Sequence, residues 1–284
     1  MEVTQTQVRQ ILTRTCGYLF DVASHSLQPY RGCGLGNSLC GVACYVRHNW
    51  YVTRGRRWGS FLEVRTNAAA SYIEHYTRER AWARRKAGRF GIFLSSSTEP
   101  FQPIERKAGI TRSLLQAMVD RRPDLLILQT HLPAVTRYID LYRELARRCE
   151  LRVHVSIESD RDTLPGLPKP ASPVRARMQA CAELRQAGLR VVATVAPLLP
   201  IDEPHRFFAE LSRVADAVVI DHFIGGDGTP TGARTRRTPL PLAMQEVHPY
   251  STSLAYRDEM VAIARTYCPG RTGVGIDGFA GRYT

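Results

Sequence analysis

The stretch SPVRARMQACAELRQAGLRVVATVAPLLP, residues 172–200, predicts a helix that runs directly into a strand. Met178, Cys181 and Leu184 recur at the spacing of one helical face, and Ser172 stands where a helix cap is expected. The apolar run that follows is short and rich in branched residues, as in a strand that is covered on both faces. A helix and a buried strand in this order are the unit from which parallel α/β sheets are built.

The same alternation of short apolar runs and longer helical patterns recurs along most of the chain. We therefore predict six βα units around a parallel sheet, in one α/β domain that spans residues 1–284. The predicted strands are Phe61–Arg65, Phe90–Ser95, Leu125–Gln129, Leu151–Ile157, Arg190–Ala196 and Ala217–Asp221.

Polar residues follow most of these strands. In a parallel α/β barrel the loops after the strands build the active site, so these residues are candidates for binding. Taken singly, most of them are explained equally well as caps of the next helix. Together they line one mouth: Thr66, Asn67, Ser95, Ser96, Ser97, Thr98, Glu99, Thr130, His131, Glu158, Ser159, Pro197, Asp221 and His222.

The net charge of +13 and a pI of about 9.8 suit a polyanionic partner such as nucleic acid. Only Lys86, Lys107 and Lys169 among the 39 basic residues are lysines, so an arginine bias of the coding DNA explains the charge equally well. No apolar run approaches the roughly 18 residues of a membrane span, and residues 1–20 lack the apolar core of a signal peptide. We therefore expect a cytoplasmic protein that does not bind membranes.

The segment PYRGCGLGNSLCGVACYVRHN, residues 29–49, holds Cys33, Cys40 and Cys44. In a reducing compartment, clustered thiols indicate metal binding rather than a disulfide framework. Two kinds of site fit: an iron–sulfur cluster with one iron left open, or a zinc site that His25 or His48 completes. The other four cysteines are assigned to core packing, a helix end or the chain termini: Cys16, Cys149, Cys181 and Cys268.

PYRGC at 29–33 and CYVR at 44–47 resemble the two ends of the cluster loop in radical S-adenosylmethionine enzymes of the spore photoproduct lyase-like branch. WGSFLEVRTNA, SSSTEPFQPIERKAGITRSLL and residues 172–200 resemble further segments of that branch, in the same order. The spacing Cys-x6-Cys-x3-Cys departs from the family's Cys-x3-Cys-x2-Cys, so the loop carries an insertion. Counting by the family spacing would place Asn37 among the ligands, but asparagine binds iron poorly.

The resemblance implies a partial (β/α)6 barrel of the radical S-adenosylmethionine type, open on one side, with the cluster loop before the first strand. It also implies a [4Fe-4S] cluster on Cys33, Cys40 and Cys44. S-adenosylmethionine at the free iron would then give a 5′-deoxyadenosyl radical that abstracts hydrogen from a substrate. An external one-electron reductant of the flavodoxin or ferredoxin type is implied as a partner. By position, the cofactor contacts would be Tyr45, Ser96, Ser97, Thr98, His131, Ser156, Glu158 and Ser159.

The substrate and the catalytic residues stay open. Photoproduct lyases return hydrogen from a cysteine at the end of the second strand, where this chain has Ser96, so simple repair of DNA photoproducts is disfavoured. A zinc-stabilised nucleic-acid-binding protein without catalysis is the alternative. The Gly- and Arg-rich segment Phe223–Pro249 is predicted to be a long loop that acts as a lid, in which Arg234, Arg236 and Arg237 grip an anionic substrate.

Overall fold

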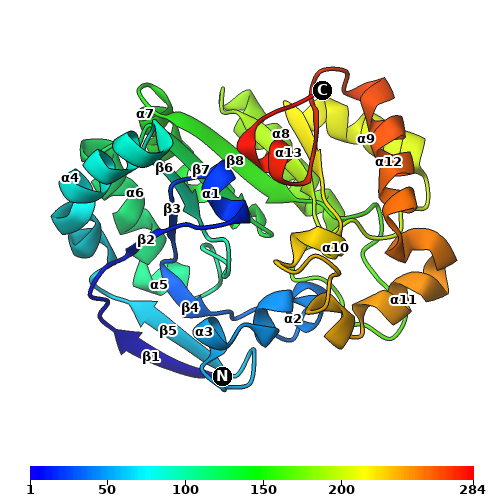
Figure 1. Cartoon of the computed structure of the whole chain (residues 1–284), viewed down its shortest axis with the longest axis horizontal. Helices are drawn as coiled ribbons and strands as arrows, with labels where there is room; N and C mark the ends of the chain where they lie inside the picture. The colour runs from blue at the N-terminus through cyan, green and yellow to red at the C-terminus, as the bar shows by residue number, and fades with distance from the viewer.

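A computed structural model describes all residues, 1–284, and shows a mostly parallel sheet of eight strands (Figure 1). The strand order is β11-β10-β9-β8-β7-β6-β3-β2, and every neighbouring pair is parallel except β2 and β3. This confirms the predicted α/β fold class. The strands are β2 (Leu12–Arg14), β3 (His25–Leu27), β6 (Gly91–Leu94), β7 (Leu125–Thr130), β8 (Glu150–Ser156), β9 (Val191–Val195), β10 (Ala217–Ile220) and β11 (Thr272–Val274).

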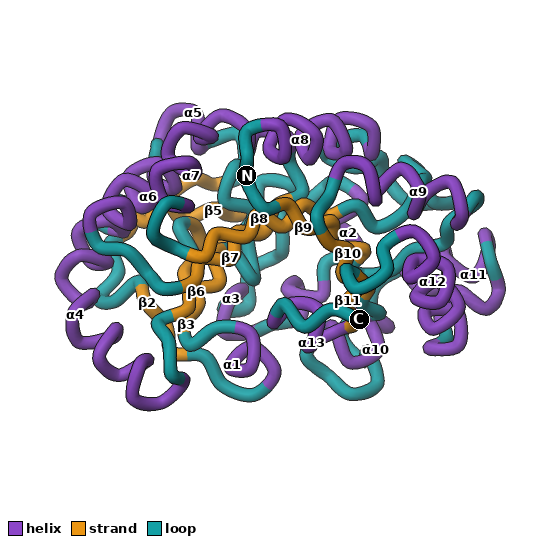
Figure 2. Tube along the Cα trace, turned by 90° about the horizontal axis from the view of Figure 1, so that it is seen from above, coloured by secondary structure: helices purple, strands orange, loops and turns teal.

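The sheet curls into an open arc, and the longer helices cover its convex side (Figure 2). Their apolar faces and the strands form the main core, in which 49 buried residues pack together. The covering helices are α4 (Ala68–Ala87), α5 (Glu105–Ala108), α6 (Ile110–Asp120), α7 (Ile139–Ala146), α8 (Val174–Gln186), α9 (Pro204–Val214) and α12 (Leu254–Tyr267), with the short 3-10 helix η2 (Pro133–Tyr138) before α7. None of the helices is long and apolar enough to cross a membrane.

The concave side of the arc is filled from both ends of the chain. Helix α1 (Tyr18–Val22) and helix α13 (Gly275–Ala280) pack against each other there. Their apolar side chains surround Phe93 on β6 and Ile127 on β7, which point away from the outer helices. One part of the barrel interior is therefore solid core.

A second, smaller sheet corrects one prediction. Phe61–Arg65 is a strand (β5), but it pairs with β1 (Glu2–Thr6) and β4 (Tyr30–Gly32) in the order β1-β5-β4, outside the main sheet. The partner of β6 in the main sheet is β3. The cysteine loop therefore follows the first parallel strand of the main sheet instead of preceding it. The sequence misled because β3 has only three residues and no apolar run, whereas Phe61–Arg65 has one.

The cap predicted for α8 was also wrong. The helix begins at Val174, and Ser172 makes no capping hydrogen bond to it. The Val174 amide instead donates to the Asp162 carboxylate at 2.7 Å, from a loop twelve residues earlier in the chain. A carboxylate from another segment satisfies the free amide as well as a local cap would. The residues around the helix start therefore cannot predict it.

The segment 223–249 is not one long irregular loop. It folds into α10 (Phe223–Gly226), η3 (Thr235–Arg237) and α11 (Leu240–Val247), and η4 (Pro249–Thr252) follows. The Asp227 carboxylate organises its turn by accepting hydrogen bonds from the amides of Thr229, at 2.9 Å, and Thr235, at 2.7 Å. Apolar side chains of α10 and α11 pack against Leu39 in the cysteine loop. The segment therefore lies beside that loop.

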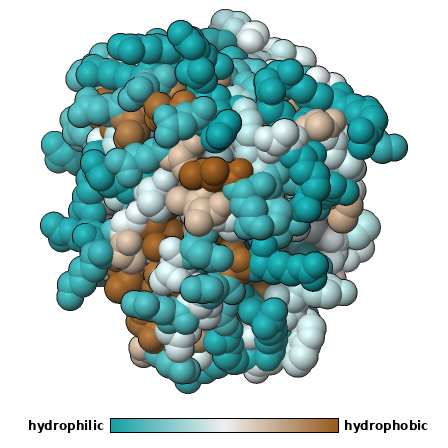
Figure 3. All heavy atoms as spheres, turned by 90° about the vertical axis from the view of Figure 1, so that its left-hand side faces the viewer, coloured by the Kyte–Doolittle hydropathy of each residue, from teal (hydrophilic) through white to brown (hydrophobic).

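The face that carries α4 is mostly hydrophilic, with apolar patches between the polar side chains (Figure 3). Arg84 and Arg85 in the basic run ARRKAGR are exposed there, and Arg84 pairs with Asp124 at 2.7 Å. This run is therefore a solvated helix face.

The Glu79 carboxylate in α4 is buried and forms ion pairs, so replacing it tests how much these pairs stabilise the fold. The carboxylate lies within 2.7–3.1 Å of Arg14, His25 and Arg78. Although burial opposes ionisation, these partners lower the pKa of Glu79 from 4.5 to about 2. Glu79→Gln should lower the free energy of unfolding at pH 7 by about 3 kcal/mol, because it removes the buried carboxylate that Arg14, His25 and Arg78 all bind. Urea unfolding measures this.

The pH dependence follows from the direction of that shift. The stabilisation by Glu79 is fully present above pH 4.5 and is lost as pH falls toward 2, so wild type and variant should converge in acid. Glu74→Gln, on the exposed face of the same helix, is the matched control and should leave stability unchanged. Equal stability of the Glu79→Gln variant and the wild type at pH 7 would contradict the prediction.

Candidate active site

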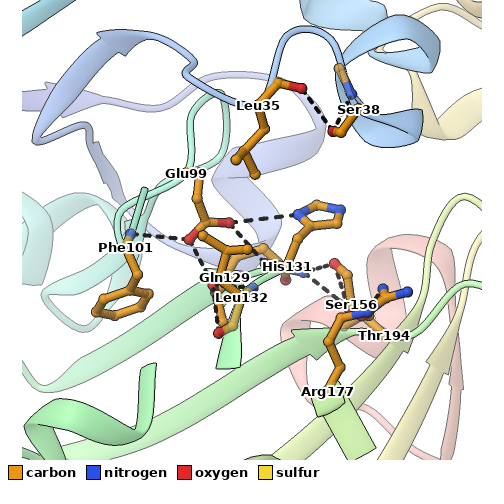
Figure 4. A network of polar contacts seen from close by, with 12 residues as sticks. Leu35, Ser38, Glu99, Phe101, Gln129, His131, Leu132, Ser156, Arg177 and Thr194 are labelled. Carbon is orange, nitrogen blue, oxygen red and sulfur yellow. Dashed lines mark hydrogen bonds and ion pairs between the residues drawn. The ribbon is translucent and has the colours of Figure 1, made fainter. Parts of the chain in front are cut away.

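The cysteine loop is compact because glycines let its backbone fold back on itself. A side chain at Gly41 would place its Cβ 2.1 Å from the Leu35 carbonyl oxygen, and one at Gly36 would lie 2.2 Å from the Cα of Gly59. Ser38 starts helix α2 (Leu39–Ala43): its hydroxyl donates to the Leu35 carbonyl at 2.7 Å and accepts from the Gly41 amide (Figure 4). No larger residue fits at these two glycines without moving the loop.

This folding brings the three predicted ligand cysteines together. Cys33 follows β4, Cys40 lies in α2, and Cys44 follows α2. Burial, together with the nearby Cys40, raises the pKa of Cys33 to about 12. Burial and the two other thiols raise the pKa of Cys44 well above its ordinary value. Each thiol is therefore within electrostatic reach of the others.

Backbone amides point at the sulfur atoms. The amides of Val46 and Arg47 favour the thiolate of Cys44, and the Leu35 amide favours that of Cys33, so each lowers the pKa of its cysteine. Such amide–sulfur hydrogen bonds offset the negative charge of a metal–thiolate centre. An apolar shell that includes Trp58 and Phe61 surrounds the loop.

These features are compatible with an iron–sulfur cluster. Thiolates are the ligands that iron–sulfur clusters take, and amide donors and an apolar shell tune them. No three His, Cys, Asp or Glu side chains converge at the spacing that a single metal ion needs. In a cluster each cysteine binds a different iron atom, so the thiols need not converge on one point. His25, one proposed fourth zinc ligand, instead pairs with Glu79 at 3.1 Å.

His131 joins the cysteine loop to the strand ends. It follows β7, contacts the Cys40 thiol, and its Nε2 lies 3.0 Å from the Glu158 carboxylate. Burial disfavours a charged ring, but Cys40 and Glu158 raise the pKa of His131 well above its ordinary value. Arg177, from α8, holds the other oxygen of Glu158 at 2.5 Å and also donates to the Ser156 carbonyl. Despite burial, Arg177 and His131 keep the pKa of Glu158 low.

A second buried carboxylate, Glu99, fixes the backbone around His131. It accepts hydrogen bonds from the Thr130 hydroxyl at 2.7 Å, the His131 amide at 2.8 Å and the Phe101 amide at 3.0 Å (Figure 4). Burial raises its pKa. Its own backbone amide also donates to Cys33, so Glu99 ties the ends of β6 and β7 to the cysteine loop.

The inner ends of the central strands carry a polar network. The Gln129 amide nitrogen donates to the Ser156 hydroxyl at 2.7 Å and to the Thr194 hydroxyl at 2.9 Å (Figure 4). The Gln129 carbonyl oxygen and the Ser95 hydroxyl are buried without a hydrogen-bond partner. Buried polar atoms in proteins are nearly always satisfied, so this end of the sheet is chemically prepared for a polar ligand.

The structure places the other predicted cofactor residues as follows. Ser96 accepts from the Gln28 side chain at 2.8 Å, and the Ser97 amide donates to the same side chain at 3.4 Å. The Thr98 hydroxyl donates to the Gly32 carbonyl at 2.6 Å, directly before Cys33. These three therefore lie beside the cysteine loop. Ser159 is buried, and its hydroxyl bonds to the Pro200 carbonyl, so its visible role is to hold a loop.

Tyr45 is half-buried and belongs to a group of titratable side chains at the end of β10. It starts the 3-10 helix η1 (Tyr45–His48), and burial and Cys44 raise its pKa to about 12. Asp221 lies within electrostatic range of Tyr45, and burial raises the pKa of Asp221 to about 7. Tyr18, from α1, faces the same carboxyl group. Tyr18 was missed because an aromatic residue near the N-terminus carries no signal that links it to the sheet.

Two further residues of the site, Arg177 and Gln129, were also missed. Arg177 lies in a helix that was predicted from its apolar face. In a chain with 39 basic residues, nothing in the sequence distinguishes this arginine from the others. Gln129 was predicted only as the last residue of a strand. The period-two alternation that turns Gln129 inward could have been read from LLILQT, in which it is the only amide.

No protein-family model matches the sequence. Over 181 residues the chain is 25% identical to the uncharacterized protein MJ0683 from Methanocaldococcus jannaschii, which covers 63% of this chain. The chain spans 61% of the length of that relative.

Solved structures of spore photoproduct lyase are similar over almost the whole chain. A variant with dinucleoside spore photoproduct superposes with a TM-score of 0.66 at 14% identity, covering 96% of this chain and 81% of the lyase. A variant with bound AdoMet and the same dinucleoside gives a TM-score of 0.64 at 16% identity, with the same coverage. In its fold, this chain therefore resembles spore photoproduct lyase, as the cysteine-loop motifs and the order of the βα units predicted.

Proposed function

We propose that this protein is a radical S-adenosylmethionine enzyme in which Cys33, Cys40 and Cys44 hold a [4Fe-4S] cluster. When bound, the cluster and S-adenosylmethionine supply a 5′-deoxyadenosyl radical that abstracts hydrogen from a substrate. One observation carries the proposal: three mutually close thiols receive backbone amides at the end of a parallel sheet whose fold is that of spore photoproduct lyase.

The chain's own residues would bind and orient the cofactor. Gln129, Ser156 and Thr194 offer hydroxyl and amide groups at the inner strand ends, which suits hydrogen bonds to hydroxyl-rich or amino-acid-like groups. His131 would fix Cys40 relative to the strand ends, because Glu158 and Arg177 hold its ring from the other side. Tyr45 would border the same space from the cysteine loop.

We propose that the substrate reaction differs from repair by spore photoproduct lyase. Ser96 stands at the end of the second predicted strand, and its hydroxyl group is engaged with Gln28. An O–H bond is too strong for a serine to return hydrogen as a cysteine does. The reaction would then end in a rearrangement, an oxidation or hydrogen return from 5′-deoxyadenosine itself.

Anaerobic purification and one assay test the proposal. The protein should be brown, contain iron and sulfide, and form 5′-deoxyadenosine from S-adenosylmethionine when dithionite is added, as measured by mass spectrometry. Without reductant the same mixture should form none. A colourless protein with one zinc ion per chain would support the non-catalytic alternative and contradict the proposal, and so would a reduced iron–sulfur protein that never cleaves S-adenosylmethionine.

A further inference from the structure

Helix α3 (Trp50–Thr53) lies beside β4, next to the cysteine loop (Figure 1). It packs against β4, which leads into Cys33, and against η1, which follows Cys44. Val52 turns inward and joins the apolar shell around these two cysteines. The helix therefore packs close to two of the three cysteines.

The outer side of α3 carries two exposed aromatic side chains, Trp50 at 68% and Tyr51 at 89% exposure. The helix is held firmly, because the Arg31 guanidinium donates to the Val52 carbonyl at 2.8 Å and to the Tyr51 carbonyl at 3.4 Å. Trp50 lies close to Gly55, where a Cβ would come within 2.9 Å of its ring. Large aromatic groups displayed on a fixed element are typical of the central contacts of protein interfaces.

The chain segment around α3 is rich in arginine and poor in acidic residues. No aspartate or glutamate occurs from Val22 to Leu62. Glu63, the first acid after this stretch, is already taken by Arg31 and Arg56. Arg54 and Arg57 are exposed, and neither forms a salt bridge. Trp50, Tyr51, Arg54 and Arg57, which we call the α3 surface, therefore combine aromatic area with uncompensated positive charge.

We propose that the α3 surface is the docking site for an acidic one-electron carrier protein of the flavodoxin or ferredoxin class. The inference rests on the proposed function, since a reduced cluster is what the carrier would supply. Positive charge attracts an acidic carrier and speeds its encounter, and aromatic contacts hold it. With a flavodoxin, one electron leaves the flavin hydroquinone, which becomes the semiquinone, and the cluster accepts that electron.

Position favours a carrier over a nucleic acid at this surface. Electron transfer slows steeply with distance, so a carrier must dock close to the cluster ligands. The α3 surface belongs to the helix that packs on the elements next to Cys33 and Cys44. The buried polar atoms without a partner, on Gln129 and Ser95, lie at the ends of β7 and β6 and not on α3.

The test uses the cluster-loaded protein and a purified bacterial flavodoxin. Calorimetry at low and high salt measures affinity, and anaerobic stopped-flow absorbance measures cluster reduction by flavodoxin hydroquinone or by dithionite. The double variant Tyr51→Ala/Arg54→Glu should bind flavodoxin at least about tenfold more weakly, the loss expected for a central interface contact, and be reduced more slowly by it. Dithionite, which needs no docking surface, should reduce the variant and the wild type equally fast.

Matched controls come from other surfaces. Tyr250→Ala removes another largely exposed tyrosine, on η4, and Arg85→Glu makes the same charge change on α4. Both variants should bind flavodoxin as the wild type does. The proposal is overturned if the double variant binds flavodoxin and is reduced by it normally. It is also overturned if the variant instead loses affinity for a short single-stranded oligonucleotide. Failure of the proposed function looks different: the dithionite-treated wild type would then give no 5′-deoxyadenosine at all.

Discussion

Replacing Cys44 with alanine is expected to remove the iron–sulfur cluster and to lower reductive cleavage of S-adenosylmethionine by at least about a hundredfold. Changes to residues that only support a metal ligand already cost up to about 100-fold in affinity or activity, and Cys44 is proposed as a ligand itself. The amides of Val46 and Arg47 would also lose the sulfur that they face. Iron and sulfide content and 5′-deoxyadenosine formation measure the effect.

Two other variants make this experiment decisive. Cys16→Ala removes an exposed cysteine remote in sequence from the loop, and should keep a full cluster. Asn37→Ala tests the alternative way of counting the loop, in which Asn37 and not Cys44 is the ligand. A full cluster in Cys44→Ala together with a lost cluster in Asn37→Ala would show that the ligands are assigned wrongly.

Replacing Arg177 with methionine should lower the free energy of unfolding by about 3 kcal/mol, as measured in urea. Arg177 is buried in α8 and pairs with Glu158 at 2.5 Å, so its loss leaves a buried carboxylate without its cation. Methionine keeps most of the length of the side chain, which separates the loss of charge from the loss of packing. The affinity for S-adenosylmethionine should fall as well, because Glu158, which contacts His131, then loses the cation that fixes its other oxygen.

The control lies two residues earlier on the same helix. Arg175 is exposed, so Arg175→Met should change stability little. If the ion pair is the cause, adding Glu158→Gln to Arg177→Met should recover part of the lost stability, because the unpaired charge disappears. A double variant that is less stable than Arg177→Met alone would mean that Arg177 acts through packing instead.

The strands that the sequence predicted well are those whose two faces are both covered. LLILQT at β7 and VVATV at β9 are short and almost wholly apolar, as expected for strands covered on both faces. Which strands pair is a different question. Phe61–Arg65 was correctly predicted as a strand but assigned to the wrong sheet, because strand pairing depends on segments far apart in sequence. The strand that does pair with β6, β3, has only three residues and no apolar pattern that would predict it.

The candidate site divides in the same way. The cysteines and His131 were found because their residue types are chemically distinctive and follow a strand or a glycine-rich turn. Glu99 was flagged only as one of many polar strand-end residues, and its three hydrogen bonds could not be foreseen. Arg177 and Tyr18 reach the site from a helix and from the N-terminal segment, and their approach depends on packing that no local pattern encodes.

The meeting of α1 and α13 inside the sheet has a consequence for synthesis of the protein. Residues 18–22 leave the ribosome well before their packing partner at 275–280, which is made more than 250 residues later. Until then only α1, and not α13, can cover the apolar side chains around Phe93 and Ile127. The interior is therefore completed only after translation has passed residue 280, and a nascent chain must be protected from aggregation until that point.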